Sequence, residues 1–268
     1  MSAASAALDR AGGGQLRAFR AVLGRDLFVT GKELPVFLAQ VILQPLFLLF
    51  VFGRVLSSLG YTQHGYSHLL FPGLVALTAV ITGMQTLAFP LVVEFGWTKE
   101  IEDRLLAPMA TGLVAAEKVV FAALRAMIAA TLMIPVGILV LGSIPWRWSG
   151  LPLLALALVL GSLLGAGLGL ALGTLVVPNR INIVFSVVFT PLLFTGCSQY
   201  PWPSLARLRW FQVVTAANPM TYVSETMRAA LVPSVPHIQP WICLVVLAGA
   251  LAGLLAIGVR GFYRRAID

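Results

Sequence analysis

The sequence predicts an all-α integral membrane protein with six transmembrane helices. Hydrophobic residues make up 59% of the 268 residues and charged residues only 10%, whereas a soluble domain carries about 25% charged residues. Long apolar runs alternate with short charged stretches along the chain. Because each helical span needs roughly 20 residues, six spans and their loops occupy the whole sequence. We therefore expect a single transmembrane domain over residues 1–268.

Six apolar runs supply these spans, at about 34–56, 69–93, 119–142, 151–177, 181–199 and 241–259. The fifth is the shortest, and Pro191 and Gly196 interrupt it. Nothing before Leu34 resembles the apolar core of a cleaved signal peptide. We expect residues 1–33 and 260–268 to form tails, with the six spans between them over 34–259.

The lysine and arginine residues orient these spans, because they gather on the cytoplasmic side of membrane proteins. With a cytoplasmic N-terminus, the inner segments hold Arg10, Arg17, Arg20, Arg25, Lys32, Lys99, Arg104, Lys118, Arg180, Arg260, Arg264 and Arg265. The outer segments hold only Arg54, Arg147, Arg207, Arg209 and Arg228. Both termini are therefore predicted to be cytoplasmic. The net charge of +8 then faces anionic lipid, and no basic stripe with interleaved aromatic residues indicates nucleic-acid binding.

Residues Gln15–Thr30 predict an amphipathic helix that lies in the membrane interface ahead of the first span. Its apolar residues fall on one helical side, namely Leu16, Phe19, Val22, Leu23 and Leu27. Its charged residues, Arg17, Arg20, Arg25 and Asp26, fall largely on the other side. Basic amphipathic helices of this kind bind membrane surfaces. The simpler interpretation is a positively charged flank that only fixes the topology.

The most charged internal stretch runs from Glu94 to Lys118, between the second and third spans. It holds five acids and three bases, namely Glu94, Glu100, Glu102, Asp103, Glu117, Lys99, Arg104 and Lys118. Each would cost about 3 kcal/mol in hydrocarbon, so the stretch is predicted to be a cytoplasmic loop. Within it Ile101, Leu105, Leu106 and Met109 recur at helical spacing, and Pro108 and Gly112 end the pattern. We expect a short amphipathic helix suited to contact a soluble partner; the alternative is a solvated loop that only joins two spans.

The outer segment from Tyr200 to Pro240 is too apolar for an exposed loop. Its first half contains Leu205, Leu208, Trp210, Phe211, Val213 and Val214, and its second half, Met220–Leu231, predicts another short helix after Asn218-Pro219. Neither helix is long enough to span a membrane. The segment therefore predicts a re-entrant helical hairpin in the outer leaflet, between spans five and six.

The fourth run carries a glycine at every fourth position, namely Gly161, Gly165, Gly169 and Gly173. Such spacing draws a smooth groove along one helix face that permits close backbone contact. Packing against a neighbouring span of the same chain is one interpretation, and a moving or dimer interface is the other. The sixth run has a shorter version at Gly249 and Gly253.

Motifs for metal or nucleotide chemistry are missing from the sequence. It contains no P-loop, so we expect no ATP bound by this chain in the usual manner. His64, His68 and His237 are isolated, and Cys197 and Cys243 form no metal pattern, which predicts no metal site, no bound cofactor and no catalytic residues. The two cysteines form either a disulfide or two packed thiols. Arg125, inside the third span, either snorkels to the inner interface or lines a substrate path.

Three segments together resemble the type-two ABC exporter permease family, whose members export drugs, glycolipids or polysaccharides from bacteria. The inner motif EIEDRLLAPM (Glu100–Met109), with Glu117-Lys118, is similar to the family's acid–leucine–proline pattern and its following lysine. The outer segment Thr195–Leu231, with Asn218-Pro219-Met220-Thr221-Tyr222 followed by Glu225 and Arg228, resembles the family's second signature. The basic N-terminal helix is the third. Lys99-Glu100 departs from the Gly-Thr that the family often has at this place.

The resemblance implies a permease subunit of an ATP-dependent exporter in the bacterial cytoplasmic membrane. Two such subunits, identical or not, would pair, and each would dock a separate ATP-binding subunit that carries ATP and Mg²⁺. The coupling surface would comprise Glu94, Glu100, Glu102, Asp103 and Arg104, with Leu105, Leu106 and Pro108 packing it. An outer gate would comprise Asn218, Pro219, Tyr222, Glu225 and Arg228, whose structural alternative is a helix cap at Asn218 and an i,i+3 ion pair.

Two other classes of protein stay open at this point. A membrane-embedded enzyme of lipid or glycan metabolism would need its catalytic groups in the Glu94–Asp103 cluster. A non-catalytic membrane assembly partner would need none. The substrate does not follow from the sequence, although few polar positions within the spans favour small apolar or amphipathic cargo.

Overall fold

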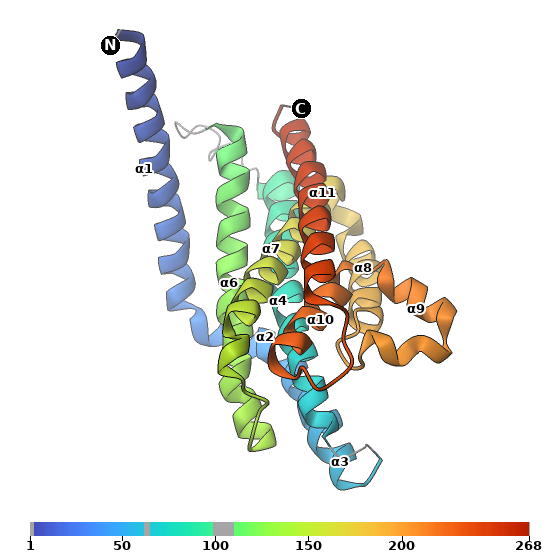
Figure 1. The fold of residues 1–268 in the computed structure, drawn as a ribbon. Helices are drawn as coiled ribbons and strands as arrows, with labels where there is room; N and C mark the ends of the chain where they lie inside the picture. Colours follow the sequence, from blue (N-terminus) through green and yellow to red (C-terminus); the bar gives the residue numbers. More distant parts are fainter. Residues whose placement is uncertain (1–2, 62–64, 99–109, 268) are drawn as a thin grey trace.

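The computed structural model describes residues 3–61, 65–98 and 110–267, and every regular element in these ranges is helical. Within these ranges, five helical stretches are long and apolar enough to cross a membrane, namely Leu34–Ser58, Tyr66–Gly96, Thr111–Leu141, Trp148–Leu175 and Pro240–Ala266. The all-helical, multi-pass membrane architecture expected from the sequence is therefore confirmed. Both chain termini lie at the same end of the molecule (Figure 1).

Helix α4 (Tyr66–Val93) is the centre of the bundle. It packs against α7 (Leu151–Leu175), α6 (Thr111–Leu141) and α10 (Pro219–Leu231). In its most apolar stretch of 18 residues, 78% of the residues are buried within the chain. The corresponding share for the last span, α11 (Pro240–Ile267), is 17%. Helix α4 therefore contacts mainly protein, whereas α11 leaves most of its surface for lipid or a partner.

The first span is assembled from three consecutive elements. Helix α2 (Leu34–Leu48) continues through a π-helical turn, η1 (Leu49–Val55), into the short α3 (Leu56–Ser58). Pro45 lies inside α2 and provides no backbone N–H for the helix. The chain then returns at the left-handed Gly65 to begin α4.

The predicted fifth span, 181–199, is the one apolar run that does not reach spanning length in the described structure. Helix α8 (Ile181–Thr195) has 15 residues, which is roughly 23 Å at 1.5 Å per residue. It follows the 3₁₀ turn η4 (Pro178–Arg180), contains Pro191 and ends directly before Gly196. Six spans are therefore not established, and the membrane crossing of α8 stays a prediction.

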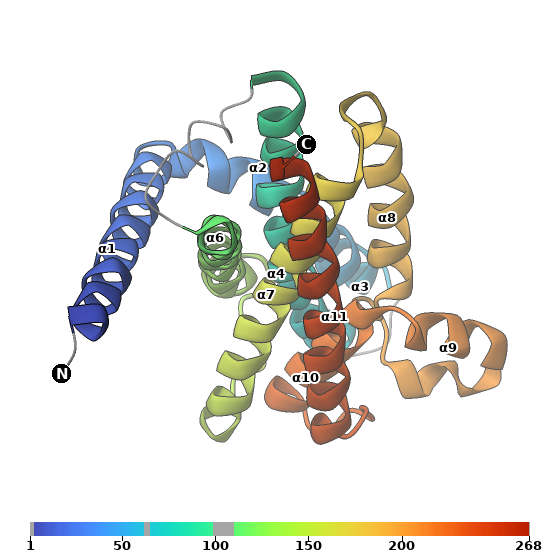
Figure 2. The same ribbon diagram turned by 90° about the horizontal axis from the view of Figure 1, so that it is seen from above.

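Helix α1 (Ala3–Lys32) is longer than the predicted Gln15–Thr30 helix, with 30 residues. It runs at a slant beside α6, apart from the rest of the bundle (Figures 1 and 2). Leu16 and Phe28 are more than half exposed. These apolar side chains are available to lipid, and the interfacial location of the helix stays a prediction.

The outer segment forms η5 (Trp202–Arg207), α9 (Arg209–Ala216) and α10. Helix α10 packs against α4, α7 and α11, whereas α9 projects sideways from the bundle (Figures 1 and 2). Trp210 and Val213 on α9 are each 70% exposed. The two predicted short helices are therefore present, and α10 is buried whereas α9 is exposed. Their re-entry into a membrane stays a prediction.

Candidate functional site

The cytoplasmic candidates of the sequence analysis are only partly described. Glu94 begins η2 (Glu94–Thr98), directly after α4. The other predicted coupling residues lie outside the described residues, namely Glu100, Glu102, Asp103, Arg104, Leu105, Leu106 and Pro108. Helix α4 ends and α6 begins at the same end of the molecule as both termini (Figure 1). The described residues that flank segment 99–109 therefore lie on the side predicted to be cytoplasmic.

An ion pair joins the two helices that border this segment. The Lys118 ammonium of α6 donates a hydrogen bond to Glu94 Oε1 at 2.8 Å and lies 2.6 Å from Glu94 Oε2. Glu94 is 8% exposed and Lys118 6%. Glu117, the neighbour of Lys118, is 1% exposed. The charges of Glu94 and Lys118 are stable at buried positions because they are paired with each other.

This ion pair fixes the geometry where the chain enters and leaves segment 99–109. Its members are 24 positions apart in sequence and belong to different elements, so the pair holds the end of α4 against the start of α6. Removing one partner of a buried pair leaves an uncompensated charge, which costs about 3–5 kcal/mol where burial is complete. A displacement of one of these two helix ends would therefore carry the other with it.

Asn218 and Tyr222 fix the turn between α9 and α10. The Asn218 side chain caps α10 by accepting a hydrogen bond from the Met220 N–H at 3.0 Å, and its amide donates to Thr195 Oγ1 at 2.9 Å. The Tyr222 hydroxyl donates to the Ala216 carbonyl at 2.8 Å. Pro219 occupies the first turn of the helix, where its missing N–H is not needed. The predicted cap is therefore present.

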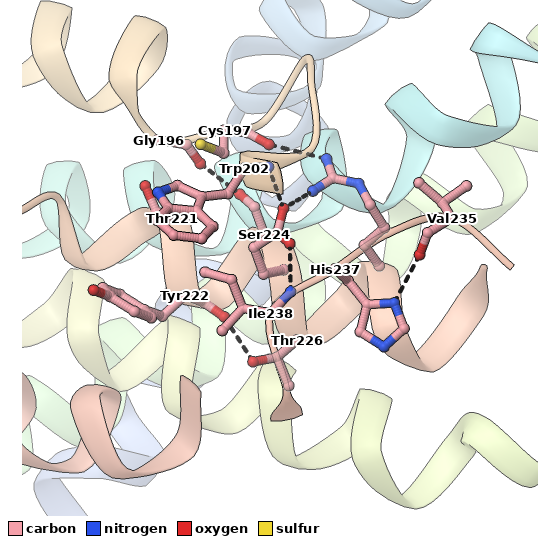
Figure 3. A network of polar contacts seen from close by, with 12 residues as sticks. Gly196, Cys197, Trp202, Thr221, Tyr222, Ser224, Thr226, Val235, His237 and Ile238 are labelled. Carbon is pink, nitrogen blue, oxygen red and sulfur yellow. Dashed lines mark hydrogen bonds and ion pairs between the residues drawn. The ribbon is translucent and has the colours of Figure 1, made fainter. Parts of the chain in front are cut away.

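Glu225 and Arg228 form a fully buried ion pair one turn apart on α10. Glu225 Oε1 also accepts from the Trp202 N–H at 3.0 Å, and Oε2 accepts from the Ile238 N–H at 3.0 Å. Arg228 Nη2 donates to the Cys197 carbonyl at 2.9 Å. Figure 3 shows Cys197, Trp202 and Ile238 converging on this network from three stretches of chain.

The Glu225–Arg228 pair therefore clamps the end of α8, the start of η5 and the approach to α11 onto α10. Burial lowers the pKa of Arg228, and the charge of Glu225 acts in the opposite direction. Cys197 has a left-handed backbone, with φ of 51°. Since a non-glycine residue rarely adopts this conformation, the bond from Arg228 to its carbonyl helps to hold a strained turn.

The comparisons with known proteins agree with this architecture. Residues 17–232 match the model of the family described as ABC-2 type transporter. The chain belongs to the ABC-2 type transporter family. A protein of Cyanophora paradoxa named putative transport permease ycf38 is 25% identical over 217 residues, which is 77% of this chain and 72% of that protein. Family and relative both indicate a transport permease rather than an enzyme.

In this ABC-2 family chain, the four glycines of α7 face neighbouring helices of the same chain. A Cβ at Gly165 would lie 2.2 Å from the Val80 carbonyl oxygen of α4, and one at Gly161 would lie 2.7 Å from Val223 Cγ1 of α10. Gly169 and Gly173 likewise approach α4. This placement agrees with packing within the chain, the first of the two interpretations of the glycine pattern.

A polar cleft lies between α2, α4 and α6, which sequence reasoning missed. Its central part has a volume of about 350 Å³ and adjoins smaller cavities with which it shares lining residues. The polar residues that line it are Gln40, Gln44, Thr78, Thr82, Gln85, Thr86 and Arg125. The sequence pattern that could have indicated this cleft is the i,i+4 spacing of Gln40 and Gln44 within the first apolar run. Only Arg125 was singled out from the sequence.

Arg125 does not occupy an ordinary aqueous flank. Its guanidinium carbon lies 3.9 Å from the centre of the Phe37 ring and 5.6 Å from that of Phe121. Arg125 lines the central part of the cleft, and it also faces the adjoining cavity that Glu94 and Lys118 line, so both alternatives for this residue stay predictions. The two thiols of this family member, Cys197 and Cys243, are free and buried, so the described structure contains no bond between them.

Proposed function

We propose that this chain is the transmembrane permease subunit of an ATP-dependent exporter in a bacterial cytoplasmic membrane. Two subunits form the pathway, with all termini in the cytoplasm. Each docks a separate subunit that binds ATP and Mg²⁺, while this chain binds no nucleotide and catalyses no covalent step. Support comes from its membership of the ABC-2 type transporter family over residues 17–232 and from its five apolar spans.

One observation carries the coupling part of this proposal. The buried Glu94–Lys118 ion pair joins α4 to α6 where the chain enters and leaves the charged segment 99–109. Helix α4 is the most buried of the five spans, so its displacement would change packing throughout the bundle. We infer that the ATP-binding partner contacts segment 99–109 and moves α4 and α6 as one body.

This arrangement supports a switch between two states of the pathway. The partner would bind one state more tightly when it holds ATP, and this difference in binding energy would shift the population toward that state. Glu102 and Arg104 are the proposed contact residues. The outer hairpin, which Glu225 and Arg228 hold together, would form the less mobile part of the pathway, at the end of the molecule opposite to segment 99–109.

Charge reversal tests the proposal. The full chain is purified from its native membrane in mild detergent, and the proteins that stay bound are identified by mass spectrometry. We expect a stoichiometric ATP-binding subunit, which Glu102→Lys or Arg104→Glu releases while membrane insertion stays normal. Arg260→Glu, at an exposed position on α11, is the matched control and should retain the partner. Recovery of the chain without an ATP-binding subunit would contradict the proposal.

A further inference from the structure

The α2–α4–α6 cleft contains an arginine that lies inside a spanning helix, about two turns beyond Lys118 of the buried ion pair. Arg125 belongs to α6, which spans Thr111–Leu141, and its Nε is buried without a hydrogen-bond partner. A partly buried arginine inside a spanning helix is expensive unless it serves a polar pathway or a ligand. The orphaned Nε therefore marks the place where a ligand group would be stabilised.

The stacking of Arg125 leaves its hydrogen-bonding groups available. A ring at 3.9 Å from the guanidinium carbon covers one face of the planar group, whereas the N–H donors lie in its plane. Those donors match the oxygen pairs of phosphate, sulfate or carboxylate groups. Thr86 and Gln85 of α4 line the same cavity and offer further hydrogen bonds.

The other charged groups that face the adjoining cavity do not remove this preference. Lys118 and Glu94 neutralise each other, and Arg25 and Asp26 bring one charge of each sign. Glu33, at the exposed junction of α1 and α2, also faces this cavity and its charge attracts the guanidinium, but Nε of Arg125 has no hydrogen-bond partner. The guanidinium therefore stays available to an external oxyanion.

The rest of the cleft is suited to an apolar chain. Val41, Leu77 and Ile81 line the adjoining cavity between α2 and α4, next to Gln40 and Thr82, and Val41 also lines the central part that Arg125 faces. Helix α2 also leaves apolar side chains exposed, since Leu43 and Phe47 are each more than half accessible. The central volume of about 350 Å³ lies within the roughly 300–1,000 Å³ of small-molecule sites.

We propose that the α2–α4–α6 cleft binds an amphiphile that carries an oxyanion, with the anionic group at Arg125 and the apolar chain against Val41, Leu77 and Ile81. This site rests on the proposed permease function and names its cargo class as anionic amphiphiles. The same chemistry is found in a resident anionic lipid, so the test separates a bound lipid from transported cargo.

The first experiment measures binding to the full chain alone, in nanodiscs of neutral lipid. The probe is radiolabelled dodecyl phosphate below its micellar concentration, with dodecyl maltoside and inorganic phosphate as competitors. We expect dodecyl phosphate to bind and neither competitor to displace it at equal concentration. Arg125→Gln should weaken binding about tenfold or more, because the charge-assisted hydrogen bonds are lost. Arg125→Lys should restore part of it, and Arg260→Gln should change nothing.

Three results would overturn the site. Equal binding by the wild type and Arg125→Gln would remove the arginine from it. Equal losses in Arg125→Gln and Arg260→Gln would reduce it to general surface charge. Full displacement by inorganic phosphate would make it a site for free oxyanions. None of these results depends on an ATP-binding partner, so they are separable from failure of the proposed function.

The second experiment decides whether the ligand is cargo. Inverted membrane vesicles that contain the chain and its ATP-binding partner should accumulate radiolabelled dodecyl phosphate when ATP is added, and Arg125→Gln vesicles should not. Binding without ATP-dependent accumulation, in vesicles whose partner hydrolyses ATP, would show a resident lipid and overturn the cargo assignment.

Discussion

Two buried ion pairs in the described part of this protein differ in what they connect. Glu94–Lys118 joins two helices through side chains alone, 24 positions apart. Glu225–Arg228 lies within one turn of α10 and also holds the backbone at Cys197, Trp202 and Ile238. We call the Glu94–Lys118 contact between α4 and α6 the joint. We call the Glu225–Arg228 pair, together with the backbone groups that it binds, the fixed corner. This difference agrees with our proposal that the end of the molecule with Glu94–Lys118 transmits movement while the end with Glu225–Arg228 resists it.

Helix α7 connects these two regions. Its Gly161 approaches Val223 of α10, close along the chain to Glu225 of the fixed corner. Its Gly173 approaches Leu91 of α4, close along the chain to Glu94 of the joint. Because glycine lets helix backbones come close together, α7 contacts both regions without long side chains of its own between them. The stability loss caused by a substitution in either region can therefore be compared with the loss caused by a substitution in α7.

The largest effect is expected from breaking the fixed corner. Arg228→Ala leaves the fully buried Glu225 without its cation, and removing one partner of such a pair costs about 3–5 kcal/mol. The variant should unfold at a markedly lower temperature in detergent, or fail to accumulate. Arg209→Ala, at an exposed position in the same hairpin, is the control and should behave like the wild type.

Arg228→Lys sharpens this prediction in case the alanine variant does not fold. Lysine keeps the charge but lacks the planar fork that reaches both Glu225 and the Cys197 carbonyl. We expect an intermediate loss of thermal stability. Wild-type stability in both variants would mean that the clamp does not hold the hairpin.

A smaller effect on stability, but a large loss of transport-linked ATPase activity, is expected at the joint. Lys118→Met leaves Glu94 unpaired, but Glu94 keeps some contact with solvent, so we expect the loss of about 1.5–3 kcal/mol that hydrogen bonds to charged groups contribute. Transport-linked ATPase activity of the assembled complex should be largely lost at temperatures where the variant is still folded. The exchanged pair Glu94→Lys with Lys118→Glu should recover part of the activity. Full activity in Lys118→Met would show that α4 and α6 need no ionic joint.

The smallest of the three effects is expected on the helix that connects the two regions. Gly165→Ala places a methyl group 2.2 Å from the Val80 carbonyl oxygen, and overpacking of this kind costs about 1–3 kcal/mol. Gly253→Ala on α11 meets nothing within 4 Å and is the matched control. Thermal unfolding in detergent measures both. Equal stability of the two variants would contradict the close contact between α4 and α7.

Much of the local structure was predictable from the sequence because it depends on short-range patterns. Five of the six apolar runs correspond to helices of spanning length, and Asn218-Pro219 indicated the start of α10 together with its cap. The i,i+3 spacing also indicated the Glu225–Arg228 pair. The remaining span, over 181–199, was not established, because α8 ends at Thr195 after only 15 residues.

The cleft around Arg125 was not predictable in the same way. Gln40 and Gln44 are two polar residues in an apolar helix, and only the approach of α2 to Gln85 and Thr86 makes them one surface. The outer clamp illustrates the same limit. The carboxylate of Glu225 was expected to contact Arg228, but its bonds to two backbone N–H groups depend on how distant stretches return to α10.

The sequence by itself determined the membrane class, the positions of the helices and the charged segment between α4 and α6, because composition and periodicity act over a few turns. Only the tertiary structure decided which charges meet. Lys118 reaches Glu94, and Arg125 stacks on Phe37 with its Nε unpartnered, because helix packing sets the distances between residues that are far apart in the chain.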